Sequence, residues 1–232
     1  MFYFNPTYLI FVLPALLLAF YAQMKVRSAY KKYTQKANLG GITGLQVAQR
    51  LLPAAGLGHV NVEGTRGQLT DHYDPRSKTL RLSAGVANTP SVAALAIVAH
   101  EIGHAQQDYQ GYAPLKLRTG LVPAVQVSAW VGPILFMIGL FLNMTGLAWL
   151  GVAAFGAGAV FALITLPVEF NASRRGLQLL ATYQLADGRE MKEVKSVLDA
   201  AALTYVAALA QTLGTLLYYV FMLTGFGGRR RD

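Results

Sequence analysis

The fold is decided by residues 119–168, TGLVPAVQVSAWVGPILFMIGLFLNMTGLAWLGVAAFGAGAVFALITLPV, a stretch of 50 residues that contains no Asp, Glu, Lys or Arg. A helix needs about 20 apolar residues to cross the roughly 30 Å of hydrocarbon in a bilayer. This stretch is therefore too long for one span. It predicts two transmembrane helices that reverse direction at the turn-forming residues Asn143, Thr145 and Gly146.

Two further stretches without charge lie at residues 1–24 and 200–228, and each predicts one more span, near Phe4–Tyr21 and near Leu203–Phe221. The first has no basic segment before its apolar residues and no clear cleavage site after them, which favours a retained anchor over a secretory signal peptide. Residues 82–99 are also free of charge, but polar residues and a proline interrupt them at positions 88–91. We therefore expect a buried helix there and not a fifth span.

The composition agrees with a membrane protein. Hydrophobic residues make up 54% of the 232 residues and charged residues only 13%, and the mean hydropathy is +0.38. These values exclude a disordered chain and argue against an ordinary soluble enzyme. The chain has no cysteine, which excludes a disulfide scaffold, a thiol nucleophile and a thiolate metal site.

The distribution of charge predicts a topology. The polar segments 25–118 and 169–199 carry 12 and 5 basic residues, and four spans place both segments on the same side of the membrane. By the positive-inside rule that side is the cytoplasm, although Arg229–Arg231 then lie on the opposite face. We expect a multi-pass protein of the cell (inner) membrane with its active site facing the cytoplasm. This topology accounts for the net charge of +9 without a nucleic-acid partner.

The larger polar segment has recognisable local signals. Thr43 is a suitable N-cap for a helix that ends at Gly56 and Gly58, and Ser91 is a suitable N-cap for a helix from Val92 to about Tyr109. Alternating residues around Val60 and Val62 predict a short strand. Residues 68–73 and 79–83 flank the turn sequence Asp74-Pro75-Arg76-Ser77 and predict a β-hairpin.

The chemistry points to His100-Glu101-Ile102-Gly103-His104, a His-Glu-x-x-His pattern within the second of these helices. Residues four apart lie on one helix face, so both imidazoles can reach one metal ion while Glu101 faces the water that the metal activates. With 4 His and 5 Glu in the chain, a chance match has odds of about 0.0015. We therefore predict that His100 and His104 bind zinc, and we favour this over a purely structural role for the pair.

A catalytic zinc site needs a third protein ligand. The candidates are His59, His72 and the acidic residues, and Glu169 is favoured because it directly follows a predicted span, where an unused charge is costly. Small residues at positions 172, 173 and 176 would share its helix face and allow a close approach to Gly103. The alternative is that Glu169 forms an ion pair with Arg174 near the membrane interface.

Three matching segments give the chain a resemblance to the YugP-like bacterial membrane neutral zinc metallopeptidases and, more distantly, to HtpX-type membrane proteases. The segments are LTDHYDPR at 69–76, AHEIGHAQQ at 99–107 and LPVEFNASRR at 166–175, with Thr43-Gly44 before them. The resemblance implies His100, His104 and Glu169 as ligands of Zn²⁺ and Glu101 as the catalytic base. The family usually has Asp where this chain has Asn171, and an acid there could orient a ligand imidazole.

The predicted fold class is a mainly α membrane protein with about four transmembrane helices and a zincin-like cytoplasmic domain that contains a small antiparallel β-hairpin or sheet. Along the chain we expect an anchor at 1–24, a metallopeptidase domain at 25–118, a transmembrane hairpin at 119–168, a helical segment with the third ligand at 169–202, and a C-terminal span with a basic tail at 203–232.

The predicted function is hydrolysis of peptide bonds in a peptide or membrane-protein substrate next to the lipid bilayer. His72 and Tyr73 are candidate donors to the oxyanion of the transition state. The edge of the hairpin is a candidate for pairing with an extended peptide backbone. The alternatives are an intramembrane protease of the site-2 type and a membrane metal-binding or scaffold protein without enzymatic activity.

Overall fold

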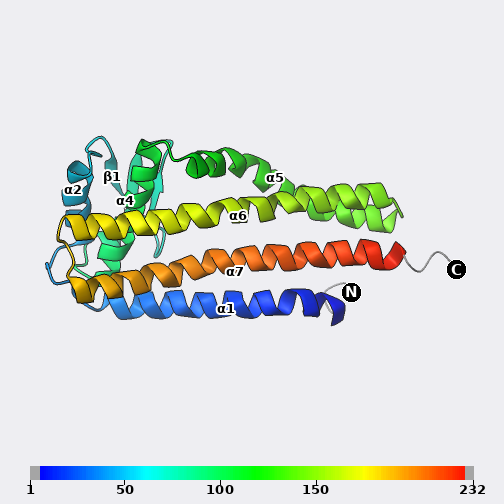
Figure 1. Cartoon of the computed structure of the whole chain (residues 1–232), viewed down its shortest axis with the longest axis horizontal. Coiled ribbons are helices and arrows are strands. Elements are labelled where there is room, and N and C mark those ends of the chain that lie inside the picture. The colour runs from blue at the N-terminus through cyan, green and yellow to red at the C-terminus, as the bar shows by residue number, and fades with distance from the viewer. Residues whose placement is uncertain (1–5, 228–232) are drawn as a thin grey trace. The chain divides into compact units, whose positions relative to one another are not determined.

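A computed structural model describes residues 6–227. These residues form ten elements, of which Figure 1 labels those with room: α1 (Pro6–Thr34), α2 (Gly44–Ala54), β1 (Asn61–Thr65), β2 (His72–Asp74), β3 (Thr79–Ser83), α3 (Ala84–Ala87), α4 (Val92–Tyr109), α5 (Ala113–Phe141), α6 (Thr145–Thr182) and α7 (Gly188–Gly227). The predicted start of the first span at Phe4 and the basic tail Arg229–Arg231 lie outside the described residues.

The chain divides into two compact units. Among the described residues, one unit contains residues 6–22, Leu117–Leu166 and residues 204–227. The other contains Gln23–Lys116 and Pro167–Leu203. The long helices α1, α5, α6 and α7 each contribute residues to both units.

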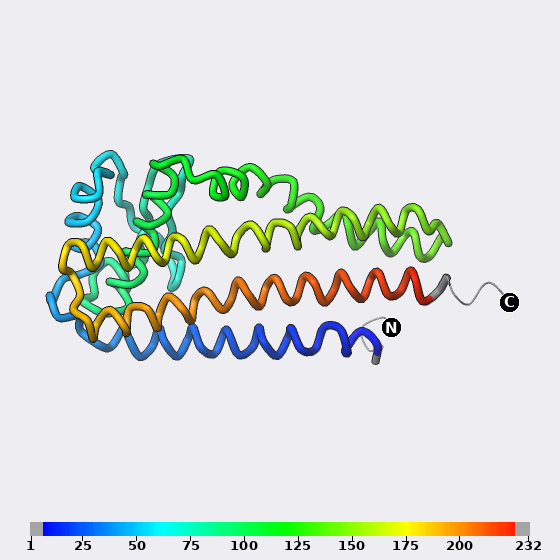
Figure 2. Tube along the Cα trace, in the orientation of Figure 1, coloured from blue at the N-terminus to red at the C-terminus, as the bar shows by residue number. Residues whose placement is uncertain are grey.

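The first unit is built from the apolar parts of the four long helices. In the part of the chain that the structure describes, four helices are long and apolar enough to cross a membrane, at Thr7–Thr34, Ala113–Phe141, Thr145–Thr182 and Gly188–Gly225. This confirms the four predicted spans, although the helices extend well into the polar segments. The reversal between α5 and α6 occupies residues 142–144, where Asn143 has a φ of 56° (Figure 2).

The second unit has its own apolar core around α4, which packs against α2 and against strands β2 and β3. Thr43 caps α2 through a capping box with Gln46, and the Ser91 hydroxyl accepts the backbone N–H of Ala94 at the start of α4. Both predicted caps are therefore confirmed, and they determine where these two helices begin.

The three strands form a mixed sheet in the order β1-β3-β2. The predicted hairpin is confirmed, because β2 pairs antiparallel with β3 in a register that places Tyr73 opposite Leu80. Strand β1 pairs parallel with the other edge of β3, with Asn61 opposite Thr79. Strand β3 is thus the buried centre of the sheet, and β2 is an edge strand that contacts α4.

Candidate metal centre

Helix α4 presents two histidines on one face. Its first eight residues, 92–99, are all Ala, Val, Leu or Ile and are almost entirely buried, so the core holds the helix in place before the motif begins. His100 and His104 follow one turn apart, with ring centroids separated by 4.8 Å and ring planes at 86°. His104 is 9% exposed, and His100 is half-buried.

Helix α6 approaches α4 at backbone contact distance, because each helix has a glycine at the crossing. A Cβ atom on Gly103 of α4 would lie 2.3 Å from the carbonyl oxygen of Ala172. A Cβ atom on Gly176 of α6 would lie 2.6 Å from the carbonyl oxygen of Ala99. No side chain fits in either place. The close approach that the small residues predicted is therefore present, and it brings Glu169 to the motif.

His100, His104 and Glu169 form a single cluster. The Oε2 atom of Glu169 lies 3.3 Å from Nε2 of His100 and 3.5 Å from Nε2 of His104. Two ligands bound at 2.0–2.1 Å to one tetrahedral zinc ion lie about 3.4 Å apart. Within the described residues this is the one group of three or more His, Cys, Asp or Glu side chains that could hold a metal ion.

The protons on the imidazoles test whether a cation fits this cluster. Nδ1 of His104 lies 3.0 Å from Oε1 of Gln107, an amide oxygen that only accepts, so Nδ1 carries a proton. In a neutral His104 the lone pair of Nε2 then faces the Glu169 carboxylate. A lone pair and a carboxylate oxygen repel each other unless a cation lies between them. The donor set and its spacing therefore fit a zinc ion.

His100 is oriented from α6. Its Nδ1 atom lies 3.0 Å from the hydroxyl oxygen of Ser173, which is four residues after Glu169. Helix α6 thus supplies both a carboxylate that faces the two imidazoles and a group that holds one of them. The ion pairs that the structure shows for Glu169 are with His100 and His104 of α4.

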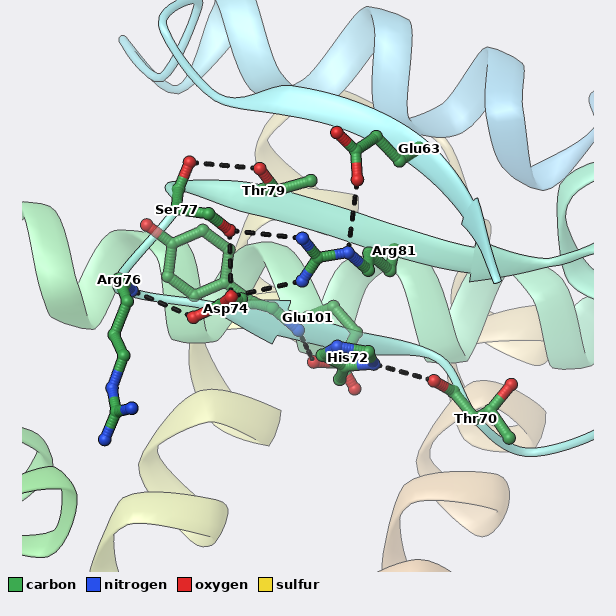
Figure 3. Close-up of polar contacts among 10 residues, drawn as sticks. Glu63, Thr70, His72, Asp74, Arg76, Ser77, Thr79, Arg81 and Glu101 are labelled. Carbon is green, nitrogen blue, oxygen red and sulfur yellow. Dashed lines mark hydrogen bonds and ion pairs between the residues drawn. The ribbon is translucent and has the colours of Figure 1, made fainter. Parts of the chain in front are cut away.

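Glu101 is held by the edge strand. The backbone N–H of Tyr73 in β2 donates to Oε2 of Glu101 at 2.9 Å, as a dashed line in Figure 3 shows. Burial raises the pKa of Glu101 to about 7, and the nearby His100 and the Tyr73 N–H oppose this rise. A carboxyl with a pKa near neutrality, next to a candidate metal ligand, is suited to accept and return a proton.

His72 and Tyr73 stand at the start of the same strand. Nδ1 of His72 lies 2.8 Å from the carbonyl oxygen of Thr70, so a neutral His72 donates to Thr70 and leaves Nε2 without a proton (Figure 3). The Tyr73 hydroxyl donates to Oδ2 of Asp108 at 2.7 Å, and Lys78 contacts the same oxygen at 2.6 Å. Burial, followed by the bond to Asp108, raises the pKa of Tyr73. The Tyr73 hydroxyl is therefore committed to Asp108.

Two other residues that the sequence singled out lie outside the cluster. His59 packs beside Tyr109 with ring centroids 5.7 Å apart and is not part of the cluster. Asn171 contacts Gln107 and Arg175, so any influence that it has on His104 passes through Gln107. Sequence reasoning missed Gln107. The available signal was a polar residue three positions after His104, and therefore on the same side of the helix.

A membrane-protein fold with a buried His-His-Glu cluster is the arrangement of a membrane metallopeptidase. Residues 8–224 match the family described as "Putative neutral zinc metallopeptidase", and the chain belongs to this family. It is 42% identical over 215 residues to "Putative membrane protease YugP" of Bacillus subtilis (strain 168), with 93% of this chain and 96% of that protein covered. No solved structure matches the chain.

Proposed function

We propose that this protein is an integral-membrane zinc endopeptidase in which His100, His104 and Glu169 hold the metal and Glu101 is the general base. The observation that carries the proposal is the convergence of two imidazole Nε2 atoms on one carboxylate oxygen, at 3.3 and 3.5 Å. Zinc bound there would polarise a peptide carbonyl and lower the pKa of water from 15.7 to about 7.

In the proposed reaction, Glu101 takes a proton from the attacking water and delivers it to the amine that leaves. The Tyr73 N–H holds one oxygen of Glu101, which directs the other oxygen to the proton that moves. Because burial raises its pKa to about 7, the carboxyl can return the proton within one catalytic cycle.

The edge strand β2 is our proposed guide for the substrate backbone. In an antiparallel pair, alternate residues direct their N–H and C=O groups away from the partner strand. Tyr73 directs its N–H to Glu101, so its C=O also faces outward and can accept an N–H from an extended peptide. Such recognition reads the backbone, and it favours flexible peptide or membrane-protein segments.

His72 is retained in the proposal as a donor to the oxyanion. Because Nδ1 of His72 is bonded to Thr70, the side chain can donate to substrate only through Nε2, and only as an imidazolium. We do not assign Tyr73 this role, since its hydroxyl proton is donated to Asp108.

We propose that the active site works at the cytoplasmic face of the cell membrane, on substrates outside the hydrocarbon core. The basic polar segments support this orientation, with 17 basic residues in 25–118 and 169–199 combined. The intramembrane alternative is less well supported. The motif lies on the 18-residue helix α4, which is not among the four candidate spans of the described residues.

The test uses full-length protein in lipid vesicles with a quenched fluorescent peptide library. Glu101→Gln should retain zinc and lose hydrolysis, whereas Glu169→Gln and His104→Ala should lose both. Full activity of Glu101→Gln would refute the assigned base. Zinc content unchanged in His104→Ala would refute the assigned metal site. Incubating Glu101→Gln with membranes should trap the natural substrate for identification by mass spectrometry.

A further inference from the structure

Gln107 is a buried polar side chain that the proposed mechanism does not use. It lies in α4 three residues after His104 and is 0% exposed. A buried amide is costly unless its donors and acceptor are bonded. Its amide is bonded at both ends, to His104 on its own helix and to two oxygens of α6, those of Val168 and Asn171.

These contacts determine which way the amide faces. Nε2 of Gln107 donates to the carbonyl oxygen of Val168 at 2.8 Å and to Oδ1 of Asn171 at 2.9 Å. A backbone carbonyl can only accept, so the nitrogen must face Val168 and the oxygen must face His104. Turning the amide over would place its oxygen against two acceptors.

Asn171 is itself held in one orientation. Nε of Arg175 donates to the same Oδ1 atom at 2.6 Å, and a guanidinium only donates. Arg175 is anchored further by Gln110, at 2.6 Å, and by the ring of Tyr112. A chain of hydrogen bonds therefore runs from Arg175 through Asn171 and Gln107 to Nδ1 of His104, and each amide in it has one permitted orientation.

We propose that Gln107 is a positioning residue that holds His104 in the tautomer with its proton on Nδ1 and its lone pair on Nε2, and that Asn171 acts on His104 through Gln107. The inference rests on the proposed function, because it concerns how one of the proposed zinc ligands is held. Two neutral amides thus perform the orienting task that a carboxylate would perform with a charge.

The two histidines differ in whether the hydrogen-bond partner of Nδ1 selects a tautomer. The partner of His100 is the Ser173 hydroxyl, which can either donate or accept, so it does not select a tautomer by itself. The partner of His104 is an amide oxygen that can only accept. We therefore expect that loss of the Gln107 side chain weakens zinc binding in a protein that still folds.

The test measures the zinc affinity of the full-length protein in detergent, by competition with a chelator of known affinity. Gln107→Met keeps the size of the side chain and removes its polar atoms, and it should weaken zinc binding by about 10–100-fold. The matched control is Gln106→Met on the neighbouring helix position, which should bind zinc as the wild type does.

A double-mutant cycle tests the order of the chain. Asn171→Leu should weaken zinc binding, and Gln107→Met/Asn171→Leu should bind zinc as Gln107→Met does, because Asn171 acts only through Gln107. Thermal unfolding of the metal-free variants shows which of them are folded. If Gln107→Met does not fold, Asn171→Leu decides the matter, and an unchanged zinc affinity in that variant overturns the proposal.

Three results would overturn the proposal while leaving the proposed function intact. They are wild-type zinc affinity in folded Gln107→Met, wild-type zinc affinity in folded Asn171→Leu, and additive losses in the double variant. Failure of the proposed function is a separate result, since in that case the wild-type protein and His104→Ala would bind zinc equally or not at all.

Discussion

Substitution of Gly103 by Ala tests how the helix crossing sets the candidate metal centre. The added Cβ would lie 2.3 Å from the Ala172 carbonyl oxygen, about 1.1 Å short of ordinary van der Waals contact, which begins at 3.4 Å. The obstacle is backbone on both sides, so a rotamer change cannot relieve it. Helices α4 and α6 must separate locally by about 1 Å, and overpacking of this kind costs about 1–3 kcal/mol.

The separation acts directly on the cluster, because the two imidazoles are on α4 and Glu169 is on α6. The distance from Glu169 Oε2 to His100 Nε2 is 3.3 Å before the change. An increase of about 1 Å exceeds the roughly 0.2 Å tolerance of metal–ligand distances. We expect zinc affinity to fall by at least about 10-fold. Peptide hydrolysis should fall by about 100-fold.

The assays for Gly103→Ala are chelator competition for zinc, hydrolysis of a fluorescent peptide, and thermal unfolding. The matched control is Gly188→Ala at the first position of α7, where an added Cβ meets nothing within 4 Å. The control should retain zinc affinity and activity. A Gly103→Ala protein with wild-type zinc affinity and wild-type activity would refute the claim that backbone contact between these helices sets the site.

Three further predictions concern the elements around the site. Thr43→Ala removes the hydroxyl that accepts the Gln46 backbone N–H in the capping box of α2 and should destabilise the protein by about 1 kcal/mol, whereas Thr43→Ser should not; equal unfolding temperatures for the two variants would contradict this. Tyr73→Phe removes the hydrogen bond to Asp108 and should lower the free energy of unfolding by about 1 kcal/mol. It should lower hydrolysis more than zinc affinity, because the backbone of β2 holds Glu101 and not a metal ligand. Unaltered hydrolysis would show that the Tyr73 hydroxyl does not help β2 to hold Glu101. Hydrogen bonds from the Arg76 N–H and the Ser77 hydroxyl lower the pKa of Asp74 from 3.8 to about 2. Ionised Asp74 therefore stabilises the fold above pH 4, and this stabilisation is lost as the pH falls towards 2. In acid unfolding the wild type should lose more stability than Asp74→Asn over that range, and parallel curves would exclude the effect.

Much of the architecture follows from local sequence signals. The charge-free run at 119–168 is too long for one helix, and Asn143 adopts the positive φ that its turn requires. Thr43 and Ser91 cap the helices that they precede. These signals depend on residues close together in the sequence, so they can be interpreted without knowledge of the tertiary structure.

The groups that hold the site residues are harder to predict from the sequence, because they come from segments that are distant along the chain. The helical spacing of His100 and His104 predicts that they share a face, and the small residues after Glu169 predict a close helix contact. Neither pattern indicates that a backbone N–H of β2 would bond Glu101, 28 residues away. The parallel pairing of β1 with β3 could not be predicted either. The two strands are not joined by a tight turn, so no local sequence pattern indicates that they pair.

The role of Asn171 illustrates the same limit. The family resemblance suggested that an acid at its position could orient a ligand imidazole, but Asn171 forms its hydrogen bonds with Gln107 and Arg175. The helix crossing that places these side chains together is visible in the sequence as Gly103 and the small residues at positions 172, 173 and 176. The rotamers that connect them are determined by the packed core.

The central claim is that one zinc ion is held jointly by His100, His104 and Glu169. X-ray diffraction from crystals of the zinc-loaded protein, recorded on both sides of the zinc absorption edge, tests this most directly. The account predicts one anomalous peak at about 2.0–2.2 Å from both imidazole Nε2 atoms and from a Glu169 oxygen. A peak bound by other residues, or the Glu169 carboxylate turned away from it, would contradict the account.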